Sequence, residues 1–147
     1  GGAKMMAEAA KAVEETAAKM NRPAPKLIAV TVLTSMDEEQ WADLSYQKAI
    51  ADQVVSLALL AKKSGLDGVV ASPQEAEAIR KACGPDFLIV TPGVRPAGAA
   101  LNDQSRVATP SGAFKNGSSH IVVGRPITQA EDKVAAAKAI VAEIRGV

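Results

Sequence analysis

Two short segments of the chain carry residue types that bind phosphate. Residues 92–95 read Pro-Gly-Val-Arg, and Gly124-Arg125 directly follows the apolar run 121–123. An arginine presents a planar fork to phosphate oxygens, and a glycine lets a backbone N–H approach them closely. Each segment follows a predicted buried strand, and parallel strands place their carboxyl ends at one edge of a sheet. The sequence therefore predicts a phosphate site that contains Arg95, Gly124 and Arg125.

The ends of the predicted strands offer little for catalysis. They read Thr34-Ser35, Ala71-Ser72, 92–95 and Gly124-Arg125, without a Lys, His, Asp or Glu directly on a strand end. No general acid, general base or Schiff-base nucleophile is therefore expected there. Asp37 is expected to cap the turn after Thr34, and His120 begins its strand and so lies at the opposite end. We predict that this chain binds a ligand and that the reacting groups lie elsewhere.

Hydrophobic periodicity predicts a leading helix followed by four strand–helix units. The helix covers residues 3–20, and the strands are expected at 26–33, 67–71, 87–91 and 121–123. Two capping signals start later helices, namely Ser72-Pro73-Gln74-Glu75 and the Thr128-x-x-Glu131 pattern before the last helix. A turn at Thr109-Pro110 starts a short helix that ends at Asn116-Gly117.

The alternation of short apolar strands with helices indicates an α/β fold with a parallel sheet and right-handed crossovers. Two architectures fit four such units. One is a doubly wound four-stranded sheet, which is complete by itself. The other is the (β/α)8 barrel (the TIM barrel), of which residues 1–147 would be one domain forming the second half. The leading helix, with no strand before it, favours the half barrel.

Composition narrows the class of partner. The 147 residues are 48% hydrophobic and 22% charged, with a formal charge of +1, so no strong field favours nucleic acid or a membrane surface. One cysteine excludes an internal disulfide, and one histidine excludes ordinary His/Cys metal clusters. No apolar run approaches the roughly 20 residues of a membrane span. These features fit a cytoplasmic protein that acts on a small molecule.

Five stretches together resemble the second half of the bacterial orotidine 5'-phosphate decarboxylase family. They are "LIAVTVLTSMDE", "SGLDGVVAS", "FLIVTPGVRP", "NDQSRVATP" and "HIVVGRPITQA", and their order and spacing match over essentially the whole chain. The resemblance implies a (β/α)8 barrel that removes CO2 from orotidine monophosphate (OMP) to give uridine monophosphate (UMP) in pyrimidine biosynthesis. It also implies a homodimeric enzyme that uses no cofactor or metal.

The resemblance also assigns roles by position. Thr34 would hydrogen-bond the pyrimidine region, and Arg95, Gln104, Gly124 and Arg125 would hold the phosphate. The chain has Asn102 where the family usually has glycine, which could reshape the phosphate loop that carries Gln104.

The largest departure from the family is the absence of its catalytic Lys/Asp array, a "DxKxxD"-like motif on early strands. The resemblance therefore implies that no residue of this chain is catalytic and that it does not decarboxylate alone. Two alternatives stay open. One is a phosphate- or nucleotide-binding half barrel without chemistry, self-paired to eight strands. The other is a sugar-phosphate enzyme of the same barrel type, against which "TVLTSMD" argues.

Overall fold

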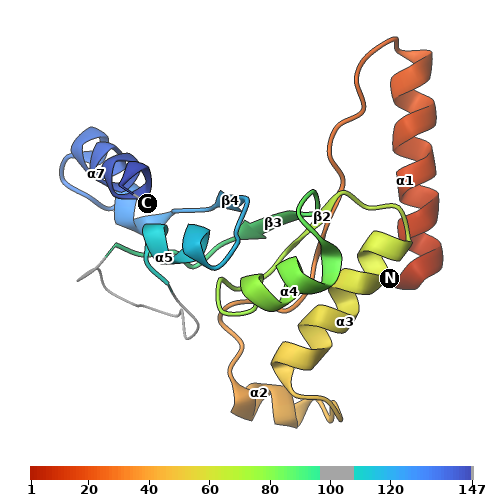
Figure 1. Cartoon of the computed structure of the whole chain (residues 1–147), viewed down its shortest axis with the longest axis horizontal. Coiled ribbons are helices and arrows are strands. Elements are labelled where there is room, and N and C mark those ends of the chain that lie inside the picture. The colour runs from red at the N-terminus through yellow and green to blue at the C-terminus, as the bar shows by residue number, and fades with distance from the viewer. Residues whose placement is uncertain (97–107, 147) are drawn as a thin grey trace.

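The computed structural model describes residues 1–96 and 108–146, and Figure 1 shows the course of the chain. Seven helices and four strands alternate within these ranges. The strands are β1 (Ile28–Val30), β2 (Gly68–Val70), β3 (Leu88–Thr91) and β4 (His120–Ile121). The helices are α1 (Gly2–Lys19), α2 (Glu38–Asp43), α3 (Ile50–Lys63), α4 (Ala76–Cys83), α5 (Pro110–Lys115), α6 (Arg125–Thr128) and α7 (Lys133–Arg145). No helix in these ranges is both long enough and apolar enough to cross a bilayer.

All four strands are parallel and lie in the order β1-β2-β3-β4, with Val30, Val70, Val90 and His120 in register. A doubly wound sheet reverses its strand order at a switch point, whereas a barrel adds each strand beside the last. The sequential order therefore confirms the (β/α)8 type and excludes the doubly wound alternative. The strands are shorter than predicted, because the parallel ladder pairs only these residues.

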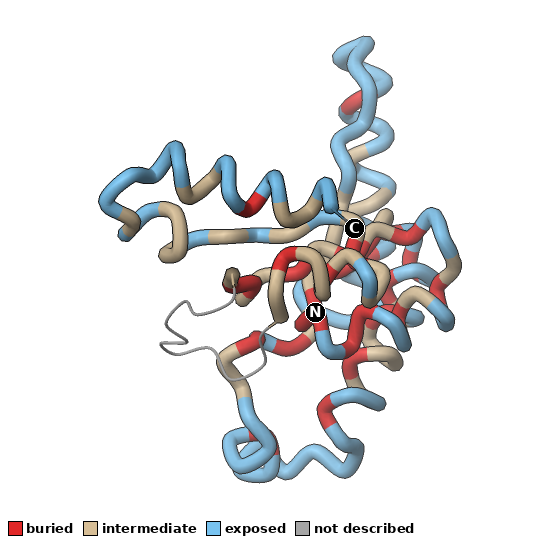
Figure 2. Tube along the Cα trace, turned by 60° about the vertical axis from the view of Figure 1, so that its left-hand side comes forward, coloured by how far each residue is buried: buried red, intermediate tan, exposed pale blue. Residues whose placement is uncertain are grey.

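Helices cover one face of the sheet, and the core lies beneath them. Val69 and Ile89 are fully buried on that face, together with residues of α3 and α4 such as Val54 and Ile79. On the opposite face Val30 is 62% exposed. Figure 2 shows the buried segments concentrated where the strands meet these helices, with α1 and α7 largely exposed. The half barrel is thus packed on its outer side and open on its inner side.

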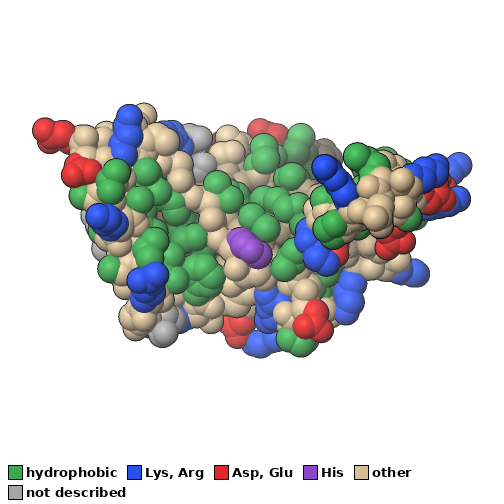
Figure 3. Space-filling view, turned by 90° about the horizontal axis from the view of Figure 1, so that it is seen from above, with side chains coloured by type: hydrophobic (Ala, Val, Ile, Leu, Met, Phe, Trp, Pro, Cys, Tyr) green, Lys and Arg blue, Asp and Glu red, His purple; other side chains and the backbone are tan. Residues whose placement is uncertain are grey.

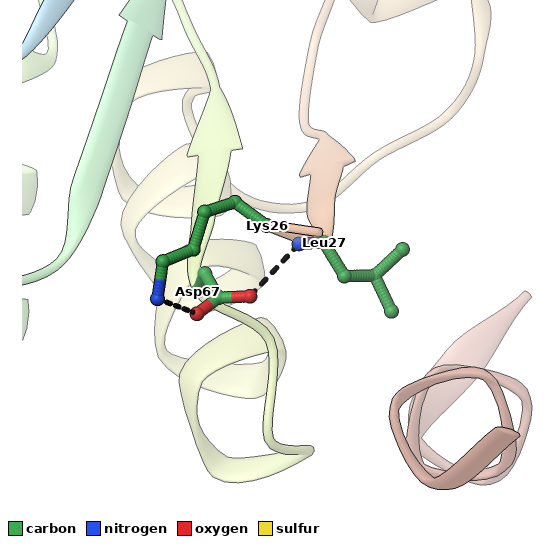
Figure 4. Close-up of polar contacts among 3 residues, drawn as sticks. All are labelled: Lys26, Leu27 and Asp67. Carbon is green, nitrogen blue, oxygen red and sulfur yellow. Dashed lines mark hydrogen bonds and ion pairs between the residues drawn. The ribbon is translucent and has the colours of Figure 1, made fainter. Parts of the chain in front are cut away.

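Hydrogen bonds tie the amino ends of the strands to their surroundings. The Asp67 carboxylate, just before β2, accepts from Lys26 Nζ and from the Leu27 backbone N–H, both at 2.8 Å, and so joins β2 to β1 (Figure 4). Arg80 of α4 donates to four backbone carbonyls, those of Gly84, Pro85, Phe87 and Gly117, and to Ser119 Oγ. One guanidinium therefore connects α4, the start of β3 and the loop before β4.

Four helix starts were predicted from sequence, with mixed outcomes. The start at Thr109-Pro110 is confirmed, because Thr109 Oγ1 accepts from Gly112 N and caps α5. The prediction for Asp37 is confirmed, because its carboxylate caps α2 and accepts from Gln40 N at 2.9 Å. The Ser72 box is wrong in its boundary: Ser72 Oγ accepts from Gln74 N in a turn, and α4 begins only at Ala76. The Thr128 cap is wrong, because Thr128 ends α6, a short helix with a proline in its first turn. Asp132 caps α7 instead.

Candidate functional site

A cavity of about 170 Å³ lies at the carboxyl ends of β3 and β4. Its lining includes three of the five residues predicted to bind the ligand: Arg95, Gly124 and Arg125. Pro92, Gly93, Val94 and Val122 complete the lining. The two arginine segments therefore meet at one site, because β3 and β4 are parallel neighbours in the sheet.

Arg95 is held in place through its backbone. Its N–H donates to the Ala108 carbonyl at 3.0 Å, and Val94 forms a parallel bridge with Ala108. The side chain is only 6% exposed, and its Nε is buried without a hydrogen-bond partner in the part of the chain that the structure describes. A buried guanidinium N–H without an acceptor costs free energy unless something else accepts from it.

Gly124 and Arg125 reach the cavity from β4. Gly124 precedes α6, and its carbonyl accepts from the N–H groups of Ile127 and Thr128. Its φ of −99° lies outside the left-handed region that favours glycine, and a Cβ built there would meet no atom of the described residues within 4 Å. Arg125 is half-buried. The helix that begins at the cavity is the short α6, and the long helix α7 begins only at Lys133.

Thr34 does not line this cavity. It is 6% exposed and lies in the turn after β1, two strands from β3. Two strand spacings are about 10 Å, so no single small group can contact both Thr34 and the two arginines, whereas a ligand with two separate polar ends can. Gln104 and Asn102 lie outside the described residues.

Two further residues lie at this edge of the sheet: Gly93, which the sequence placed in the phosphate segment 92–95 but not among the named site residues, and Glu75, which sequence reasoning missed. Gly93 lines the cavity with φ +75°, a conformation that favours glycine, and the Pro92-Gly93 pair is the signal of a turn that needs positive φ. Glu75 is a carboxylate only 6% exposed, four residues beyond Ala71 at the carboxyl end of β2. The sequence pattern Ser72-Pro73-Gln74-Glu75 was interpreted as a capping box, so Glu75 was assigned to a helix start and not to the site.

Comparison with known proteins gives consistent results. Residues 1–140 match the profile described as the orotidine 5'-phosphate decarboxylase / HUMPS family. The orotidine 5'-phosphate decarboxylases of Moorella thermoacetica and Geobacter metallireducens are 59% and 54% identical to this chain over 98% of its length. The matches cover 58% and 59% of those two proteins, so the chain spans about three fifths of the curated relatives it matches.

Solved structures show the same fold. The chain superposes on an uncharacterized conserved protein from Geobacillus kaustophilus with a TM-score of 0.78 and 36% identity, over 98% of this chain and 60% of that one. Orotidine 5'-phosphate decarboxylase from Lactobacillus acidophilus gives a TM-score of 0.69 and 46% identity, over 84% of this chain and 50% of that one.

Proposed function

The chain belongs to the orotidine 5'-phosphate decarboxylase / HUMPS family, and we propose that it supplies the phosphate- and pyrimidine-binding part of an enzyme converting OMP to UMP and CO2. In this proposal Arg95, Gln104, Gly124 and Arg125 hold the phosphate, and Thr34 contacts the pyrimidine. The complete enzyme is a cytoplasmic homodimer that acts on a free nucleoside monophosphate.

The observation that carries the proposal is the buried guanidinium of Arg95 in a cavity that Arg125 also lines. Two cations at one small site repel each other, and water screens them poorly where one is buried. A phosphate dianion would relieve both costs: it neutralises the charge and accepts from the Arg95 Nε that lacks a partner within the described residues. Charge-assisted hydrogen bonds of this kind are about twice as strong as neutral ones.

The conformation at Gly124 supports the same ligand. The space beside the Gly124 Cα is open among the described residues, so another group can approach the backbone there closely. A bare backbone beside Arg125 lets a phosphate oxygen approach the main chain. The distance between Thr34 and the cavity supports a ligand with a polar ring at one end and a phosphate at the other.

We further propose that this chain alone does not catalyse decarboxylation. Within the described residues, the turns directly after the four strands contain no lysine, and Glu75 is the buried carboxylate near them. One buried carboxylate without a lysine cannot reproduce a Lys/Asp array. Purified chain assayed with OMP should release no CO2 above the uncatalysed background. Turnover that scales with the chain and survives repurification would overturn this part of the proposal.

The phosphate assignment is tested by titrating UMP and uridine into the chain in a calorimeter. Arg125→Ala should weaken UMP binding by about 2–4 kcal/mol, because each charged hydrogen bond contributes about 1.5–3 kcal/mol. Uridine binding should barely change, and the salt dependence of UMP binding should flatten. Arg125→Lys should recover only part of the affinity, since a point charge replaces the fork.

Arg145→Ala is the matched control, because it removes an exposed arginine of α7 that does not line the cavity. It should leave UMP binding unchanged. If Arg125→Ala weakens UMP and uridine equally, Arg125 supports the fold and the phosphate assignment fails.

A further inference from the structure

The carboxylate of Glu143, near the end of α7, is hydrogen-bonded to a different helix. Glu143 Oε1 accepts from the Ser111 backbone N–H and from Ser111 Oγ, both at 3.1 Å, in the first turn of α5. The other charged residues of α7, Lys133, Lys138 and Arg145, are exposed, and Figure 3 shows Lys and Arg side chains on the surface at this end of the molecule. Glu143 itself is half-buried. The carboxylate of α7 is thus used in a contact with α5.

These two hydrogen bonds complete the first turn of α5. A helix leaves the N–H groups of its first turn without acceptors inside the helix. Pro110 has no N–H, and the N–H of Gly112 donates to the Thr109 side chain at 3.1 Å. The N–H of Ser111 would remain, and Glu143 accepts from it. The position of this turn therefore depends on α7.

The first turn of α5 comes directly after the residue that anchors Arg95. The Ala108 carbonyl accepts from the Arg95 N–H at 3.0 Å, and Ala108 pairs with Val94 in a parallel bridge. Two residues separate Ala108 from Ser111. A displacement of this turn would therefore move the acceptor of the Arg95 N–H.

The same contact leads in the other direction to Arg125. α7 packs against both α5 and α6, and α6 begins at Arg125. Figure 1 shows α5 and α7 together at the end of the molecule opposite α1. The contact between Glu143 and Ser111 thus closes a path from Arg125 through α6 and α7 to α5 and the Arg95 segment.

We propose that Glu143 is a positioning residue of the anion site: it fixes the Arg95 segment relative to Arg125 and does not line the cavity. The proposal rests on the proposed function, in which both arginines hold one phosphate. Hydrogen bonds weaken steeply when their geometry is lost, so a shift of one arginine lowers the affinity of the pair. The charge of Glu143 acts in the opposite sense, because a carboxylate repels a phosphate dianion.

Titration of UMP and uridine into Glu143→Ala tests the proposal. UMP binding should weaken by about fivefold, which is within the range for residues that influence a site without touching its ligand. Uridine binding should not change. Glu143→Gln should recover most of the UMP affinity, because an amide oxygen can accept both hydrogen bonds without the charge. Circular dichroism of each variant checks that the chain is folded.

Glu131→Ala is the matched control. Glu131 is exposed, carries the same charge and precedes α7, so its replacement should leave UMP binding unchanged. Ser111→Ala removes the hydroxyl hydrogen bond and keeps the one from the backbone N–H, so it should give a loss smaller than that of Glu143→Ala.

Hydrogen exchange of the Arg95 amide gives a readout that needs no ligand. The Arg95 N–H should exchange faster in Glu143→Ala than in the wild-type chain, and at the wild-type rate in Glu143→Gln and Glu131→Ala. If the wild-type chain binds no UMP, the phosphate assignment fails, whereas the Arg95 amide still decides whether Glu143 positions this segment.

Four results would overturn the proposal in a chain that binds UMP. They are a UMP affinity in Glu143→Ala equal to or above that of the wild type, an equal loss of affinity for uridine, a loss in Glu143→Gln as large as in Glu143→Ala, and an unchanged exchange rate at Arg95. The third result would assign the effect to the charge of Glu143 and not to its hydrogen bonds.

Discussion

The two ends of the parallel sheet differ in whether their polar side chains have hydrogen-bond partners within the described residues. At the amino ends, Asp67 accepts from Lys26 and Leu27, and Arg80 donates to four carbonyls and a hydroxyl. At the carboxyl ends, Arg95 is more deeply buried than Arg80, yet its Nε has no acceptor within the described residues. The half-buried Arg80, before β3 in the chain, thus has acceptors for its guanidinium donors, whereas the buried Arg95, after β3, has an Nε without one among the described residues.

This difference indicates that residues at the amino ends stabilise the fold, whereas residues at the carboxyl ends bind the ligand. In (β/α)8 barrels residues at the amino ends of the strands maintain the fold, and ligands bind at the carboxyl ends. A polar group matched within the chain stabilises it, whereas one that lacks a partner lowers stability and is available to a ligand. The comparison predicts that substitutions at the amino ends change unfolding free energy, and substitutions at the carboxyl ends change binding.

Arg80→Ala should give the largest effect. It removes the charged donor from four carbonyls at once, and we expect a loss of about 3–5 kcal/mol in the free energy of unfolding. Chemical denaturation measures this loss. Lys81→Ala is the control on the same helix, since Lys81 is exposed and pairs only with Glu77 among the described residues. Equal stability of the two variants would contradict the assignment of Arg80 as the connection between α4, β3 and β4.

Arg95→Met should affect ligand binding and not stability, the opposite of what is expected for Arg80→Ala. Replacing a buried cation that lacks a hydrogen bond at Nε with an apolar side chain should leave the unfolding free energy unchanged or raise it by about 1 kcal/mol. The same change should weaken UMP binding at least tenfold. A large loss of stability would show that Arg95 is matched within the chain, and the contrast with Arg80 would disappear.

The sequence predicted the order of elements well because that order follows from strong local signals. Apolar runs and helical stripes located all four strands and the long helices, and parallel pairing then placed Arg95 beside Arg125 without further information. Helix starts were less predictable. Thr128 has the right residue type for a cap, but Pro126 starts a separate four-residue helix that includes it.

The role of Arg80 could not be predicted, because its five acceptors are separated from it by up to 39 residues in sequence. They converge only when α4, β3 and β4 pack together. The burial of the Arg95 side chain could not be predicted either, because burial depends on how the whole fold packs. Residue types and spacing indicated which side chains could bind an anion, whereas the unmatched Nε became visible only in three dimensions.

Asp67→Asn should cause a smaller loss of stability at the amino ends than Arg80→Ala, and it should change how stability depends on pH. The hydrogen bond from Lys26, followed by that from the Leu27 N–H, holds the pKa of Asp67 below its ordinary value. A lowered carboxyl pKa gives stability that is present above the unfolded-state pKa of about 3.9 and is lost as pH falls through the folded-state pKa. Asp67→Asn should therefore cost about 1–2 kcal/mol at pH 7 and should remove part of the acid dependence. Urea midpoints measured between pH 7 and pH 2 check both effects, and a variant with an unchanged acid limb would contradict them.

Thr34→Val should give the smallest effect and tests whether the carboxyl ends contain two separable subsites. Thr34 is buried after β1 and is absent from the cavity that Arg95 and Arg125 line, so its hydroxyl can serve the base end of a nucleotide but not the phosphate. Losing one hydrogen bond should weaken UMP binding by about 0.5–1.5 kcal/mol and leave the affinity for inorganic phosphate nearly unchanged.

Thr31→Val is the control, because the Thr31 hydroxyl already donates to the Val70 carbonyl at 2.8 Å and its loss should affect stability rather than binding. Calorimetric titration of both ligands into the two variants separates the possibilities. If Thr34→Val weakens UMP and phosphate equally, Thr34 supports the loop after β1, and the carboxyl ends contain one subsite instead of two.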